Sequence, residues 1–80
     1  MNLNNIVENA IIAHNVNGLS WNDIRCSIPF DCEVNVRARR IIAMIDDGWF
    51  TQDEIDSFTA KQFEEKGNRI RIEREVFGSK

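Results

Sequence analysis

The only thiols and the only imidazole of this 80-residue sequence belong to Cys26, Cys32 and His14. Structural zinc takes four ligands, and a catalytic cysteine needs a base in a recognisable local pattern. Neither requirement is met, because no further Cys or His accompanies this set. We therefore expect no metal, no cofactor and no enzymatic activity. We interpret the cysteines as partly buried free thiols, with a disulfide as the alternative.

A second candidate for metal chemistry is the acidic run that follows residue 46. Residues Asp47 to Glu54 match the second half of a calcium-binding loop, with Gly48 at the sharp turn. The positions that should supply the first ligands hold Ala43 and Ile45, whereas calcium needs six or more oxygen atoms. The pattern thus indicates a solvated helix N-terminus, which is also available as a docking surface for a basic partner.

Charge is distributed unevenly along the chain, although its net value is only -3. Residues 46–65 carry seven carboxylates against Lys61 alone. Residues 66–80 carry five basic side chains against Glu73 and Glu75. A non-specific nucleic-acid binder is usually basic overall, so the total disfavours that class but leaves room for a local basic surface.

The first element that must position these side chains is a helix near the start of the sequence. Apolar residues recur at helical spacing from Leu3 to Ile11, and His14 continues the stripe. Asn2 is placed to cap this helix, and Gly18 follows its end. We interpret His14 as a half-buried structural residue rather than a catalytic base.

Two further helices are predicted around a proline-containing turn. Ser20 is placed to cap the first of them, Pro29 ends it, and Asp31 is placed to cap the next, which spans residues 32–47. This third helix buries an apolar stripe formed by Val34, Ala38, Ile41, Ile42 and Ile45. Its outward side would carry Asn35, Val36, Arg39 and Arg40, as in a helix that reads a DNA groove.

The second half of the chain predicts one more helix and two short strands. Thr51 and Glu54 form a capping-box pattern, which begins an acidic helix over residues 51–66 that ends at Gly67. Residues 69–76 begin with strict alternation, which predicts a strand with Ile70 and Ile72 inward and Arg69 and Arg71 outward. Since an isolated strand is unstable, we expect it to pair with residues 49–51.

This order of elements resembles the winged helix-turn-helix family. The resemblance rests on Leu19 to Ile24 at the start of the second helix, and on Arg40 to Thr51, which is similar to the end of a recognition helix entering a wing strand. It implies a mainly α domain with a small β element (α+β), with about four helices and a short two-stranded wing. We expect residues 1–80 to form a single small domain with a flexible tail at 78–80.

The resemblance also implies a function and a set of contacts. The protein would be a small non-enzymatic regulator of transcription that binds duplex DNA through helix 32–47. Asn35 would pair with adenine, Arg39 and Arg40 with guanine or phosphate, and Val36 with a thymine methyl group. Arg69 and Arg71 would reach the DNA backbone from the wing. A homodimer, through the first helix or the last strand, is compatible with this function.

Each of these arginines also has a purely structural interpretation, as a solvated side chain or the partner of a nearby carboxylate. The alternative function is therefore a small acidic inhibitor or modulator, of phage or mobile-element type, that docks its helix 51–66 on a host or defence protein. Its surface would comprise Asp46, Asp47, Asp53, Glu54, Asp56, Glu64 and Glu65.

Apolar runs are short throughout the sequence. None approaches the roughly 20 residues that a membrane-spanning helix needs. The asparagine-rich start lacks the basic and apolar regions of a signal peptide. We therefore expect a cytoplasmic protein with no membrane association.

Overall fold

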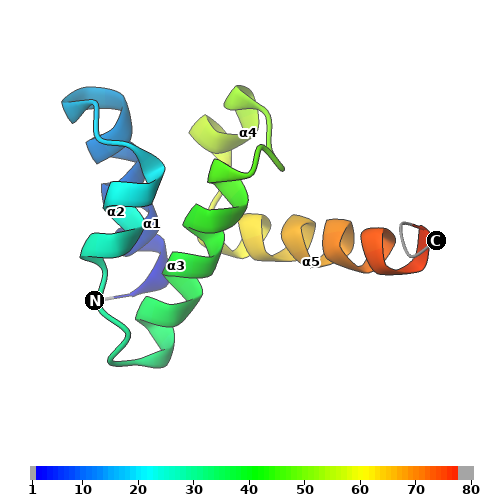
Figure 1. The fold of residues 1–80 in the computed structure, drawn as a ribbon. Coiled ribbons are helices and arrows are strands. Elements are labelled where there is room, and N and C mark those ends of the chain that lie inside the picture. The colour runs from blue at the N-terminus through cyan, green and yellow to red at the C-terminus, as the bar shows by residue number, and fades with distance from the viewer. Residues whose placement is uncertain (1, 78–80) are drawn as a thin grey trace.

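The computed structural model describes residues 2–77, and within this range the chain forms helices only (Figure 1). In chain order they are α1 (Leu3–Asn17), α2 (Trp21–Ser27), α3 (Glu33–Asp46), α4 (Gln52–Ser57) and α5 (Ala60–Phe77). The expected α+β domain with a two-stranded wing is therefore wrong, because the described residues contain no strand. The predicted tail at 78–80 lies outside the described range. No helix between residues 2 and 77 has the length and apolar character needed to cross a bilayer.

The predicted starts of the first two helices are confirmed. The Asn2 side chain accepts a hydrogen bond of 2.9 Å from the Asn5 N–H, and the Ser20 hydroxyl accepts one of 3.1 Å from the Asp23 N–H. Gly18 ends α1 at a φ of 71°, a conformation that costs glycine little. Local side-chain chemistry thus sets these boundaries.

The start of α3 differs from the prediction. Cys32, and not Asp31, occupies the cap position, and its side chain makes no capping bond. The Asp31 carboxylate instead accepts a hydrogen bond of 2.6 Å from the Asn35 amide. The Asp31 carboxylate is therefore bonded to the Asn35 side chain in the first turn of α3, and not to the backbone N–H groups of that turn.

Helix α3 is the element on which the others pack. It contacts α1, α2 and α5 (Figure 1). The side chains of Ala38, Ile41 and Ile42 on it have 0% exposure. From α5, Phe63 enters the same core and is also fully buried. Helix α3 therefore has three helical neighbours, which leaves only a narrow strip of its surface free.

The expected strand at 49–51 is a loop that delivers an aromatic side chain to the core. Gly48 turns the chain at a φ of 82°, and Phe50 is buried with its ring centroid 5.0 Å from that of Phe63. The predicted capping box at Thr51 and Glu54 is confirmed and begins α4. The aromatic pattern at 49–51 thus reflects burial and not strand pairing.

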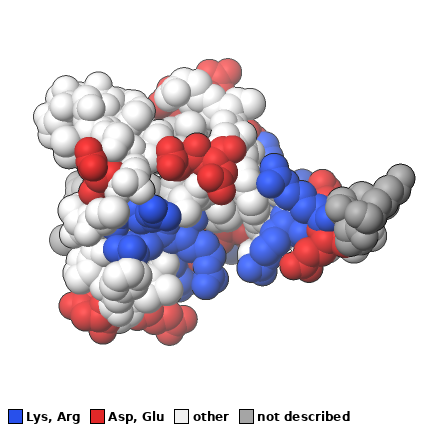
Figure 2. Space-filling model, viewed as in Figure 1, with Lys and Arg blue, Asp and Glu red and all other residues white. Residues whose placement is uncertain are grey.

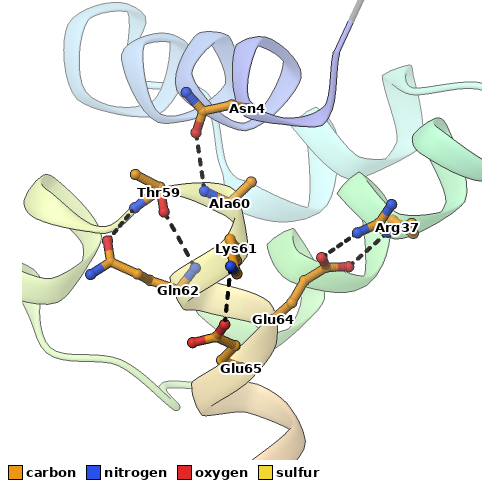
Figure 3. A network of polar contacts seen from close by, with 8 residues as sticks. All are labelled: Asn4, Arg37, Thr59, Ala60, Lys61, Gln62, Glu64 and Glu65. Atoms are coloured by element: carbon orange, nitrogen blue, oxygen red, sulfur yellow. Dashed lines mark hydrogen bonds and ion pairs between the residues drawn. The ribbon is translucent and has the colours of Figure 1, made fainter.

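The acidic helix expected over 51–66 is two helices. The chain leaves helical conformation at Phe58, and Thr59 begins a second capping arrangement with Gln62, in which the Thr59 N–H donates to the Gln62 side chain at 2.8 Å (Figure 3). The Ala60 N–H donates to the Asn4 side chain at 3.1 Å, which fixes the start of α5 against α1.

Helix α5 continues through Gly67 and Asn68, so the predicted helix end there and the predicted strand at 69–76 are both wrong. Gly67 is buried against α3, where an added Cβ would lie 2.4 Å from the Met44 Sδ. The glycine thus permits close approach of two helices rather than a turn. Ile70 is half-buried and Ile72 is 56% exposed, because helical geometry points these residues in different directions.

Beyond Gly67, α5 projects away from the other four helices (Figure 1). We call residues 68–77 the α5 arm. Every side chain from Arg71 to Val76 is exposed. The arm therefore presents most of its circumference to solvent, in contrast to the first half of α5, which holds the buried Ala60 and Phe63.

A proline substitution tests the continuous α5 directly. Asn68→Pro should lower the free energy of unfolding by about 3 kcal/mol or more, because proline in a helix interior removes a backbone hydrogen bond and clashes with the preceding turn. Urea denaturation followed by circular dichroism measures the change. As a control, Gln52→Pro at the first position of α4 should change stability little. A tolerated Asn68→Pro would instead support a turn at this position.

Candidate functional site

Arg39, expected to face DNA, is directed back into the protein. Its Nη1 donates hydrogen bonds to the backbone carbonyls of Arg25 at 2.8 Å and Ile28 at 2.6 Å. Its guanidinium lies 3.6 Å from the ring centroid of Phe30. These partners belong to the end of α2 and to the turn before α3, so Arg39 links α3 to both of them.

Of the other three α3 residues expected to contact DNA, one is bonded within the protein and two are exposed. Asn35 is half-buried, and its amide is engaged by the Asp31 carboxylate. Val36 and Arg40 are exposed. The structure therefore leaves two of the four expected groove-reading side chains on the outer surface of α3.

The two arginines expected on a wing lie on α5 instead. Arg69 and Arg71 are exposed on the α5 arm. Arg74, which the sequence interpretation did not single out, places its guanidinium 4.8 Å from the centre of the Trp49 ring. It lies two helical turns after Gly67, and this spacing puts both residues on the α3 side of the helix.

An ion pair that sequence reasoning missed joins α3 to α5. Arg37 donates from Nε and Nη2 to the two carboxylate oxygens of Glu64, at 2.9 and 2.5 Å (Figure 3). This hydrogen bond and the negative charge of Glu64 raise the pKa of the Arg37 guanidinium. Glu64 is thereby committed to the fold, although it was expected on a partner-binding surface.

A second ion pair joins α4 to α5, between Glu54 and Lys66. The hydrogen bond from Lys66, followed by that from the Thr51 N–H, lowers the pKa of the Glu54 carboxyl. Glu65 faces Lys61 at 4.0 Å on the exposed side of α5. Four of the seven candidate carboxylates are exposed and outside the ion pairs among the described residues, namely Asp46, Asp47, Asp53 and Asp56.

The space-filling view brings the charges together on one face. Figure 2 shows Lys and Arg gathered over the α2 and α3 side of the molecule and again along α5, on the same face. Asp and Glu side chains lie between and around these basic groups. The face therefore offers separated basic points rather than a continuous basic field.

The residues first considered for metal or thiol chemistry, Cys26, Cys32 and His14, are either exposed or packed against a neighbouring side chain. Cys26 and Cys32 are free and exposed, so the expectation of partial burial is wrong. His14 stacks on Trp21 with ring centroids 4.0 Å apart, and its Nδ1 donates to the Leu19 carbonyl at 2.8 Å. Within residues 2–77 no group of three or more Cys, His, Asp or Glu side chains is arranged to hold a metal ion.

Comparison of the chain with known proteins found no matching family model, no matching curated protein and no matching solved structure. A function for the face that carries the Lys and Arg groups is therefore inferred from the geometry and chemistry of this chain alone.

Removing the Arg39 side chain tests its structural role. Arg39→Ala should lower the free energy of unfolding by about 1–3 kcal/mol, because the carbonyls of Arg25 and Ile28 lose their donor. The neighbouring exposed Arg40→Ala should change it by no more than about 0.5 kcal/mol. Thermal and urea denaturation measure both variants. Equal effects of the two substitutions would contradict the assigned role of Arg39.

The Glu54–Lys66 pair predicts a dependence of stability on pH. Because the folded pKa of Glu54 lies below its ordinary value of 4.5, this carboxylate stabilises the fold above that pH. The contribution is lost as the pH falls through the lowered pKa. In Lys66→Met the loss of stability on acidification should be smaller, as measured by urea denaturation across this pH range. An unchanged acid dependence would mean that Lys66 does not set the Glu54 pKa.

Proposed function

We propose that the protein is a non-enzymatic, cytoplasmic DNA-binding protein that contacts the phosphate backbone of a duplex. The observation that carries the proposal is the presence of Lys and Arg from α2, α3 and α5 on one face (Figure 2). Backbone contact needs positive charges at separate points, and it needs no continuous basic surface.

Arg40 and Arg71 are the residues that we assign to this contact. Both are exposed, and neither takes part in an ion pair among the described residues. They come from different helices, so a single phosphate strand would have to span α3 and α5 to meet both. Arg74 extends the same set, although its position over Trp49 also stabilises the fold.

Contact with phosphate is favoured over contact with base edges because two of the α3 side chains expected to read bases are bonded within the protein. Asn35 donates a hydrogen bond to Asp31, and Arg39 donates from Nη1 to two backbone carbonyls, so both side chains are held by contacts within the protein. The exposed strip of α3 includes Glu33 and Asp47 near its two ends, and these carboxylates repel phosphate. Affinity should therefore be moderate, strongly dependent on salt and nearly independent of sequence.

The test is fluorescence anisotropy with a labelled duplex of about 20 base pairs at about 50 mM salt, where phosphate contacts are strongest. Arg40→Ala with Arg71→Ala should weaken binding about tenfold or more and reduce the dependence on salt by about two phosphate contacts. The matched Arg40→Lys with Arg71→Lys variant should retain most of the affinity, because lysine keeps the charge. No binding by the unmodified protein at this salt would refute the proposed function.

A second candidate function uses the opposite charge. The exposed Asp46, Asp47, Asp53 and Asp56 lie at the end of α3 and on α4, and they fit a basic partner protein. Reversal of charge at Asp53 and Asp56 should abolish capture of such a partner and leave duplex binding intact or tighter. The two functions are thus separated by which set of substitutions removes binding.

A further inference from the structure

Phe30, in the turn between α2 and α3, presents an aromatic ring at the surface. This residue is 72% exposed, whereas Phe50 and Phe63 are buried in the core. A single exposed apolar side chain needs no explanation by itself. What distinguishes Phe30 is that a guanidinium group covers one face of its ring.

The ring of Phe30 is supported by a fixed neighbour. The guanidinium of Arg39 lies 3.6 Å from the ring centroid, and its Nη1 is held by the backbone carbonyls of Arg25 and Ile28. Pro29 comes directly before Phe30 and restricts the backbone of the turn. Because Phe30 keeps 72% exposure with Arg39 on one side, the opposite face of the ring is open to solvent. The turn therefore offers a flat aromatic surface.

The charges around this ring favour a polyanion as its partner. Arg39 lies against the ring, and the exposed Arg40 is the next residue of α3. Two carboxylates are close in the sequence. That of Asp31 accepts a side-chain hydrogen bond at the start of α3, where the helix dipole offsets its charge. Glu33 lies one helical turn before Arg37, on a different side of α3 from Arg39.

A flat aromatic surface next to a phosphate contact matches the chemistry of a nucleobase. Bases stack on aromatic side chains through their faces, with little dependence on sequence. Within a duplex these faces are covered by the neighbouring base pairs, and only the base edges reach the grooves. A base face is therefore available to Phe30 where the base is unpaired, as in a single-stranded overhang next to a duplex.

We propose that Phe30 stacks on an unpaired base of DNA whose backbone contacts Arg40. The protein then prefers a duplex with a single-stranded overhang to a blunt duplex. This inference rests on the proposed function, because Arg40 is assigned to phosphate there. It adds a contact with the face of a base, which needs no hydrogen-bond donor from α3.

Fluorescence anisotropy tests the proposal by comparing a blunt duplex of about 20 base pairs with the same duplex carrying an overhang of about 5 nucleotides. The unmodified protein should bind the overhang duplex about tenfold more tightly. Phe30→Ala should lose this gain and keep its affinity for the blunt duplex, because Arg40 and Arg71 remain. Phe30→Trp should keep the gain or increase it, since a larger ring stacks at least as well.

Phe30→Leu is the matched control. It retains an apolar side chain of similar bulk but has no aromatic face, so it should also lose most of the gain. Circular dichroism verifies that each variant is folded. Because Phe30→Ala and Phe30→Leu carry the same expectation, one of them decides the question if the other fails to fold.

Three outcomes would overturn the stacking contact and leave the proposed function in place. The first is equal affinity of the unmodified protein for the two duplexes. The second is an undiminished gain in Phe30→Ala, which would mean that the overhang binds elsewhere. The third is a gain that is lost in Phe30→Ala but retained in Phe30→Leu, which would mean apolar packing, as against a protein, instead of stacking on a base. No binding of either duplex would refute the proposed function together with this inference.

Discussion

The burial of α3 against three helices is the interaction on which the rest of this structure depends. Ala38, Ile41 and Ile42 are fully excluded from solvent, and α1, α2 and α5 each contact the helix that carries them. A domain of this size buries only about 60–65% of the surface of its unfolded chain, so one central helix supplies a large share of the available core. The helices that pack around it determine which of its polar side chains stay free.

Polar side chains complete the packing that this small core begins. Arg37 joins α3 to α5 through Glu64, and Arg39 joins α3 to the end of α2 through two backbone carbonyls. The bonds from Arg39 to two backbone carbonyls are of the charge-assisted kind that contributes about 1.5–3 kcal/mol, whereas solvent screens the more exposed Arg37–Glu64 pair. Some of the side chains that the sequence suggests for binding are thus bonded within the protein. The proposed DNA contact is therefore assigned to the exposed Arg40 and Arg71.

The elements that were predicted correctly are those set by local chemistry. The caps at Asn2, Ser20 and Thr51 act on backbone groups within three residues, and Gly18 needs only its own positive φ. The predictions that were wrong concern residues whose conformation depends on contacts with residues distant in the sequence. Gly67 resembles a helix end, yet it exists in a helix because Met44 approaches it. The alternation at 69–76 fits a strand as well as it fits an exposed helix, and in the structure the helix that begins at Ala60 continues through it.

The candidate site shows the same division. Helical periodicity correctly indicated that Val36 and Arg40 are exposed, because exposure follows from backbone direction. It failed for Arg39, whose long side chain returns to the α2 carbonyls from a position directed outward. It also missed the Arg37–Glu64 pair, since the partners are 27 residues apart in sequence.

Native-state hydrogen exchange tests most directly whether α3 is the centre of the fold. If the domain depends on burial of α3, the slowest backbone amides should lie in α3 between Ala38 and Ile45, together with those around Phe63. Amides of α4 and of the α5 arm should exchange faster, because these segments have fewer buried contacts. Amides in α3 that exchange as fast as those of the α5 arm would contradict the account.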